Sequence, residues 1–138
     1  MESRINETIM RHDKGFNCAQ SVACTYCDLV GMSEEDAFRA MEGFGLGMGC
    51  MEGTCGAVSG AVMLAGLKGS SVNLEKPDSK GRTYKKAAEI IRRFKETAGA
   101  TACRDLKGVD TGKVLLSCPD CIKTAAALAE EILFSEEK

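Results

Sequence analysis

The pattern of apolar and polar positions predicts helices along nearly the whole chain. Residues 1–14 carry a moderate amphipathic pattern, and a second helix is expected from the capping residue Asn17 to about Val30. Another amphipathic segment begins at Ser33, whose side chain can cap an acidic first turn. No segment alternates apolar and polar residues as a strand does, so the pattern predicts an all-α fold.

The most apolar segment, residues 56–67, lies near the middle of the chain and is small and apolar on every side. Such a segment is typical of a buried helix. A long amphipathic helix is expected over residues 79–98, a short helical turn over 101–106 and a last helix from Ser117. We therefore expect one domain over residues 1–138, a bundle of about five to six helices around a small, glycine-rich central helix.

Length and charge exclude two classes of partner. The 138 residues carry a formal net charge of −2 with mixed signs, so no basic stripe is available for nucleic acid. The longest apolar run, residues 57–67, is too short to span a bilayer and contains glycine. We expect neither a nucleic acid nor a membrane as partner.

Eight cysteines are a high number for a chain of this length. They are Cys18, Cys24, Cys27, Cys50, Cys55, Cys103, Cys118 and Cys121. The first residues lack the pattern of a signal peptide, so we expect a cytoplasmic protein with reduced thiols. In that compartment clustered cysteines favour metal binding or redox chemistry over structural disulfides.

Several cysteines stand just after a residue that can cap a helix. The pairs are Asn17–Cys18, Thr54–Cys55 and Ser117–Cys118, and Cys103 follows Thr101 in a weaker version of the same pattern. The N-terminus of a helix favours a thiolate, and several thiolates together suit a soft metal. We expect these helix starts to converge, so that Cys18, Cys55, Cys103 and Cys118 share one pocket as metal ligands, each with a lowered pKa.

A glycine-rich segment, residues 43–60, leads into the central helix. Its glycines allow backbone N–H groups to approach a cofactor or its sulfur ligands, and the candidates are Gly47, Gly49, Gly53 and Gly56. Cys50 lies in this segment. Two interpretations of it stay open: a fifth metal ligand, or a loop thiol without a role.

The remaining cysteines have a simpler interpretation. Cys24 and Cys27 lie within a predicted helix, where cysteines pack as small hydrophobic residues. Asp28 follows them where c-type haem attachment needs a histidine, so we expect no such haem. For Cys121 we favour a core position over a redox pair with Cys118.

The motifs together resemble a known family. They are residues 15–20, residues 43–60 with Cys55-Gly56-Ala57-Val58-Ser59-Gly60, residues 103–106 with Gly108 and Asp110, and Cys118-Pro119 before the last helix. The chain resembles the C_GCAxxG_C_C family of redox-active proteins, which is similar to part of the split-Soret cytochromes. The resemblance implies an all-helical fold and a redox or metal-binding role, with no known substrate.

Three hypotheses follow for function. The first is a redox protein with an iron–sulfur cluster or other metal on Cys18, Cys55, Cys103 and Cys118, with or without Cys50. The second is a metal-free thiol–disulfide protein that uses Cys50 with Cys55 or Cys118 with Cys121, so that Cys55 and Cys118 are the candidate catalytic thiols. The third is a structural zinc protein or helical interaction module. Whether the chain is an oxidoreductase or an electron carrier stays open, as do its redox partner and a homodimer.

Overall fold

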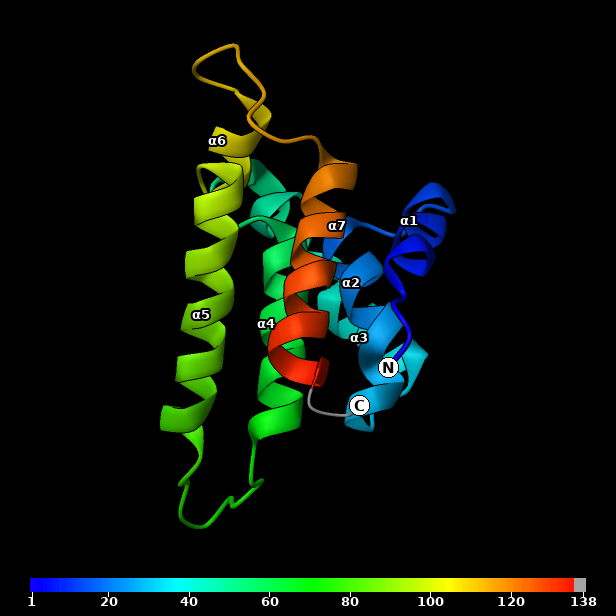
Figure 1. Cartoon of the computed structure of the whole chain (residues 1–138), viewed down its shortest axis with the longest axis vertical. Coiled ribbons are helices and arrows are strands. Elements are labelled where there is room, and N and C mark those ends of the chain that lie inside the picture. The colour runs from blue at the N-terminus through cyan, green and yellow to red at the C-terminus, as the bar shows by residue number, and fades with distance from the viewer. Residues whose placement is uncertain (136–138) are drawn as a thin grey trace.

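The computed structural model describes residues 1–135, which form seven α-helices and no strand. The helices are α1 (Ile5–Asp13), α2 (Cys18–Tyr26), α3 (Glu34–Met41), α4 (Gly56–Gly69), α5 (Lys80–Ala98), α6 (Cys103–Lys107) and α7 (Cys118–Ala129) (Figure 1). Short 3-10 turns extend α2 and α3, and a π-helical turn, Glu130–Phe134, extends α7. The all-α prediction is confirmed; α6, expected only as a helical turn, brings the number of helices to seven.

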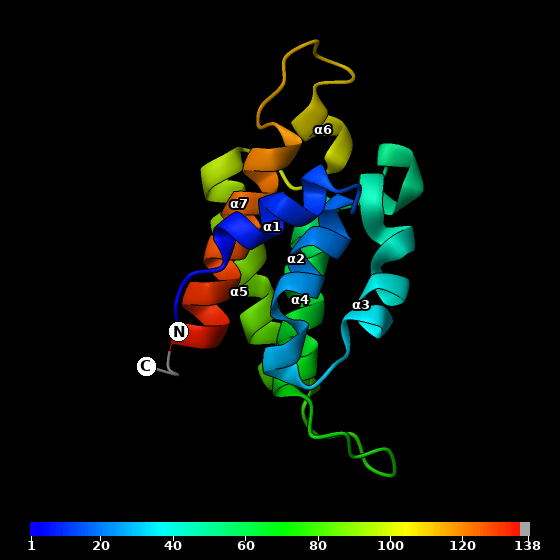
Figure 2. The ribbon, with the colours of Figure 1, turned by 90° about the vertical axis from the view of Figure 1, so that its right-hand side faces the viewer.

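Helix α4 is the centre of the bundle, as its sequence predicts. It packs against α2, α5 and α7, and Figures 1 and 2 show it enclosed by these helices. Val58, Ala61 and Leu64 of α4 are fully buried. Because apolar residues occur on every side of α4, helices can cover it from several directions at once.

Gly60 allows α2 to approach α4 closely. A Cβ atom at this position would lie 2.7 Å from the carbonyl oxygen of Ala19 and 3.2 Å from the Cβ of Val22, both on α2. The contact is therefore possible only without a side chain at residue 60. Since Cys18 is the first residue of α2, this contact also places the N-terminus of α2 beside the N-terminus of α4.

Three helices begin at the caps that the sequence predicts. The side chain of Asn17 accepts the N–H of Gln20 at 2.8 Å in a reciprocal capping box. The side chains of Ser33 and Ser117 likewise accept the backbone N–H groups of Asp36 and Asp120, without a reciprocal bond. These caps fix where α2, α3 and α7 begin.

The starts of α4 and α6 differ from the prediction. Cys55, not Thr54, is the N-cap residue of α4, and Ala102, not Thr101, is that of α6. Thr54 and Ala102 instead face each other in an isolated antiparallel bridge. The two threonines thus lie in a short backbone pairing between distant segments, which no local capping pattern could have revealed.

No helix within residues 1–135 combines the length and apolar character needed to cross a bilayer.

The packing of Gly60 gives a stability prediction. Gly60→Ala should lower the free energy of unfolding by about 1–3 kcal/mol, because the added methyl group forces α2 away from α4. Gly66→Ala is the matched control on the same helix, since a Cβ there meets nothing within 4 Å. That variant should be neutral or gain up to about 1 kcal/mol from helix propensity. Chemical denaturation of both variants tests this, and equal stabilities would contradict it.

Candidate thiol pocket

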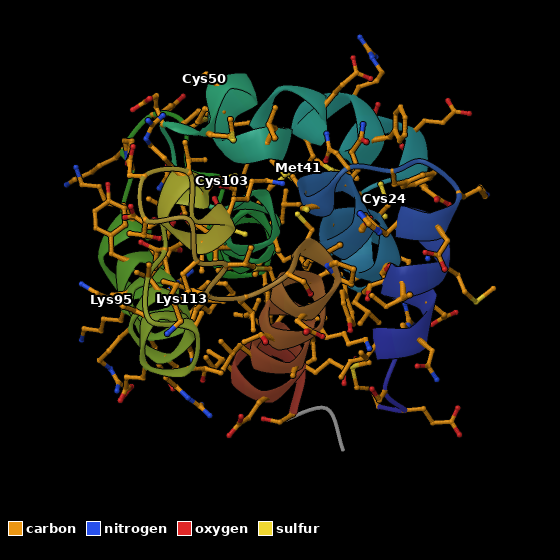
Figure 3. All side chains as sticks on the ribbon, turned by 90° about the horizontal axis from the view of Figure 1, so that it is seen from above. Cys24, Met41, Cys50, Lys95, Cys103 and Lys113 are labelled. Atoms are coloured by element: carbon orange, nitrogen blue, oxygen red, sulfur yellow. The ribbon has the colours of Figure 1, made fainter. Side chains whose placement is uncertain are left out.

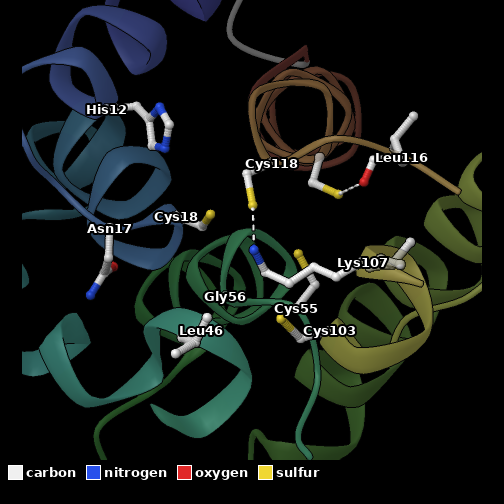
Figure 4. A pocket seen from close by; sticks show the side chains of 12 residues that line it. His12, Asn17, Cys18, Leu46, Cys55, Gly56, Cys103, Lys107, Leu116 and Cys118 are labelled. Atoms are coloured by element: carbon white, nitrogen blue, oxygen red, sulfur yellow. Dashed lines mark hydrogen bonds between the residues drawn. The ribbon is translucent and has the colours of Figure 1, made fainter. Parts of the chain in front are cut away.

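A cavity of about 210 Å³ lies at the end of the bundle that carries α6. Its lining comes from residues far apart in the sequence, and Figure 4 shows them facing a common space. Five of the eight cysteines line it: Cys18, Cys55, Cys103, Cys118 and Cys121. We call this cavity and its five cysteines the thiol pocket. It brings together the four cysteines for which the sequence predicts a common pocket.

The starts of four helices deliver the cysteines to the thiol pocket. Cys18, Cys103 and Cys118 are the first residues of α2, α6 and α7, and Cys55 is the N-cap residue of α4. Cys121 lies one turn into α7, on the same side of the helix as Cys118 by the three-residue spacing.

The isolated antiparallel bridge between Thr54 and Ala102 brings Cys55 next to Cys103. The N–H of Cys55 donates to the carbonyl of Thr101 at 2.7 Å, and the N–H of Cys103 donates to the carbonyl of Gly53 at 3.0 Å. The residues paired lie nearly fifty positions apart in the sequence. Their alignment therefore depends on the tertiary fold.

The predicted glycines differ in their relation to the pocket. Gly56 lines it, and Gly53 supplies the carbonyl that holds Cys103. Gly47 has φ +56°, and a Cβ there would lie 2.4 Å from the Cβ of Cys103, so the segment packs directly on this cysteine. A Cβ at Gly49 would meet nothing within 4 Å. Three of the four glycines thus adjoin the thiol pocket.

Cys50 does not reach the thiol pocket. It is exposed and is absent from the lining, and its Sγ lies 4.0 Å from the carbonyl oxygen of Gly47 in its own turn. Figure 3, a view from this end of the molecule, shows Cys50 nearer the periphery than Cys103. Cys121, which the sequence favoured as a core residue, is the fifth thiol in the lining and is also buried in the core.

Cys24 and Cys27 pack in the core, as predicted. Both are 3% exposed and cluster with Ala37 of α3, away from the thiol pocket. Burial raises the pKa of each thiol. They are therefore poor nucleophiles at neutral pH.

The pKa of Cys55 is lowered to about 7, well below the ordinary range for a thiol. The largest cause is a hydrogen bond from the thiol of Cys121, which stabilises the thiolate against the cost of burial. The backbone N–H groups of Ala57 and Val58 at the start of α4 and the positive charge of Lys107 lower it further. Cys55 is therefore the pocket thiol that these groups favour as a thiolate.

The expectation of a lowered pKa is wrong for Cys18 and Cys103. Burial raises the pKa of Cys18 to about 12, and the neighbouring Cys118 and Cys55 add to the shift. Burial also raises the pKa of Cys103. At these positions the cost of burying a charge outweighs the favourable effect of the helix N-terminus on the thiolate. A charge on a neighbouring thiol raises the pKa further, so the thiols of one pocket do not all ionise together.

Two polar residues of the pocket were not predicted from the sequence. His12 of α1 is half-buried and lines the cavity, and so does Lys107 at the end of α6. The Nζ of Lys107 donates to the Sγ of Cys118 at 3.3 Å (Figure 4). A signal for Lys107 existed in its position four residues after Cys103, on the same face of a helix. The pattern of α1 held no such signal for His12.

The spacing of the described side chains bears on how a metal ion could be held. Within residues 1–135, no group of three or more histidine, cysteine, aspartate or glutamate side chains is placed to hold a metal ion. The thiol of Cys121 donates to the carbonyl of Leu116 at 3.7 Å, and the sulfur of Cys118 accepts from Lys107 (Figure 4). As placed, three pocket sulfurs do not converge on one centre.

The effect of Cys121 on the pKa of Cys55 predicts how the reactivity of Cys55 changes with pH. The rate of Cys55 alkylation by iodoacetamide should rise with pH around an inflection near 7, and Cys121→Ala should move this inflection upward because the thiolate loses a donor. Peptide mass spectrometry at a series of pH values measures it. Cys27→Ala, a buried cysteine outside the pocket, is the control and should leave the inflection in place. An unchanged inflection in Cys121→Ala would contradict the prediction.

Comparison with known proteins bears on this geometry. A family model described as "Putative redox-active protein (C_GCAxxG_C_C)" matches residues 16–132, which include the whole thiol pocket except His12. Neither the curated proteins nor the solved structures searched contain a match. Because the family model covers most of the chain, this protein belongs to the C_GCAxxG_C_C family.

Proposed function

We propose that the thiol pocket is a dithiol redox centre in which Cys55 and Cys121 cycle between two thiols and one disulfide. One observation carries the proposal: Cys55 and Cys121 line the same cavity, and Cys121 is the largest influence that lowers the pKa of Cys55 to about 7. A thiol whose pKa lies near the ambient pH combines thiolate population with nucleophilicity. The pair differs from both pairs that the sequence suggested, and it retains Cys55 as the reactive thiol.

The chemistry is thiol–disulfide exchange with a small disulfide. The Sγ thiolate of Cys55 attacks one sulfur of the substrate RS–SR, so that a mixed disulfide forms and RS⁻ leaves. Cys121 then loses its proton and attacks the Sγ of Cys55, which releases the second RS⁻. The protein loses two electrons as it gains one disulfide, and the substrate gains them as two thiols. The reverse sequence reduces the centre again.

The surroundings of the two thiols support different roles for them. Cys55 is the nucleophile because its charge is stabilised by Cys121, by two backbone N–H groups and by Lys107. The interaction with Cys55, burial and the charges of neighbouring thiols raise the pKa of Cys121, which therefore keeps its proton until the mixed disulfide forms. We assign this chemistry to the cytoplasm, where cellular reductants return such a centre to the dithiol state.

The proposal predicts a specific disulfide. Treatment with bis(2-hydroxyethyl) disulfide should remove thiols in pairs, and peptide mass spectrometry should identify a Cys55–Cys121 link. Cys121→Ala should instead accumulate the mixed disulfide on Cys55, because no second thiol resolves it. Cys50→Ser serves as the matched control and should form the link as the unchanged protein does. A link between other cysteines, or none, would contradict the assignment.

A second candidate function is a soft-metal or iron–sulfur centre held by Cys18, Cys55, Cys103 and Cys118. The composition of the lining favours it, since five thiols and no carboxylate border the cavity. Their sulfurs would have to move together before they could share one centre. Such a centre would supply one-electron transfer.

Cys103 separates the two candidate functions. It has no role in the Cys55–Cys121 exchange, whereas a four-thiolate centre requires it. Anaerobically purified protein with a metal centre should contain stoichiometric metal, and Cys103→Ser should lose at least half of it while Cys50→Ser keeps it. Metal analysis and visible absorption measure the outcome. Metal-free protein that still forms the Cys55–Cys121 link would exclude the centre, and zinc without redox response would indicate a structural role.

A further inference from the structure

Lys107 is the basic side chain beside the reactive thiols. It is half-buried at the end of α6, and its Nζ donates to the Sγ of Cys118 at 3.3 Å. Its charge also acts on Cys18, Cys55 and Cys103. One cation therefore influences four of the five thiols in the pocket.

Within residues 1–135, the hydrogen-bond partner of this cation is a thiol and not a carboxylate. The lining of the cavity contains neither aspartate nor glutamate. Three carboxylates lie at α6 outside the cavity. Asp105 of α6 is exposed and does not line the cavity, and Arg104 binds Asp110 through two contacts of 2.8 Å and Glu52 through one of 3.3 Å. Among residues 1–135, Cys118 is the hydrogen-bond partner given for the side chain of Lys107. Its charge is thus directed into the cavity.

The helices around the cavity act in the same direction. α2, α4 and α7 all begin there, and the N-terminus of a helix carries partial positive charge. The walls between the polar groups are apolar, with Leu46, Leu106 and Leu116 in the lining. Apolar walls limit the screening of a charge by water, so the lysine acts on whatever enters.

We infer that the thiol pocket selects small anionic electrophiles, with Lys107 as the positioning residue that holds the negative group beside Cys118. The substrate class is then a small disulfide that carries a carboxylate or a comparable anionic group. The cavity of about 210 Å³ limits the ligand to a small molecule. This inference rests on the proposed function, because it takes the thiol pocket as the place where the substrate reacts.

A pair of alkylating reagents tests the charge preference without a disulfide step. Iodoacetate and iodoacetamide react alike: the thiolate displaces iodide, a carbon–sulfur bond forms and the carbon–iodine bond breaks. They differ by one negative charge, so the ratio of their rates at one cysteine cancels the fraction of thiolate. Peptide mass spectrometry gives this ratio at Cys118, with the exposed Cys50 outside the pocket as internal reference.

At low ionic strength the iodoacetate-to-iodoacetamide ratio at Cys118 should exceed that at Cys50 by about threefold or more. Lys107→Gln should bring the two ratios together, while Lys107→Arg should preserve the difference because it keeps the charge. Lys113→Gln is the matched control, an exposed lysine on the loop after α6 that does not line the cavity. A difference that survives in Lys107→Gln, or a ratio at Cys118 no higher than at Cys50, would overturn the inference.

A measurement on the unchanged protein guards against a variant that misfolds. Raising the salt concentration to about 0.5 M should remove most of the preference at Cys118, because added ions screen a partly exposed charge. A preference that is independent of salt would overturn the role of Lys107. Loss of the Cys55–Cys121 disulfide together with an intact, Lys107-dependent preference would overturn the proposed function alone.

Discussion

The site depends on the short backbone pairing between residues 53–55 and 101–103. Two hydrogen bonds, from Cys55 to the Thr101 carbonyl and from Cys103 to the Gly53 carbonyl, hold the start of α4 against the start of α6. Because α4 is the buried centre of the bundle, the pairing fixes α6 relative to α2 and α7 as well. The pairing places Cys103 directly beside Cys55 and holds α6, which carries Lys107, at the start of α4.

Within the pocket, loss of water competes with the stabilisation of charge. Each helix start offers a favourable electrostatic environment, yet burial and the other thiols oppose ionisation. Cys55 ionises most readily because it combines a thiol donor, backbone N–H groups and a nearby lysine. Cys18 is as much part of the pocket, but burial and the charges of Cys118 and Cys55 raise its pKa by more than Lys107 lowers it. One ionised thiol beside protonated ones is the arrangement that disulfide exchange requires, since attack and resolution are successive steps.

The glycine-rich segment acts mainly through its shape. Leu46 and Met48 have positive φ angles of 55° and 65°, which residues other than glycine rarely adopt. Leu46 contributes to the wall of the pocket. Such strained backbone is retained where surrounding contacts impose it, and here the close contact of Gly47 with Cys103 is one of them. The same turn directs Cys50 to solvent, so this segment contributes no thiol to the pocket before Cys55.

The sequence alone determined the all-α class, the central helix, the caps at Asn17, Ser33 and Ser117, and the family, because helix periodicity, capping and motif spacing are local properties. It also singled out four of the five cysteines of the pocket, since each lies at a helix start. Only the tertiary structure decided that Cys121 replaces Cys50, that Lys107 and His12 join the pocket, and that Cys55 alone of the buried thiols has a lowered pKa. These outcomes depend on which distant segments pack together and bury the thiols, and a local sequence pattern carries no information on that packing.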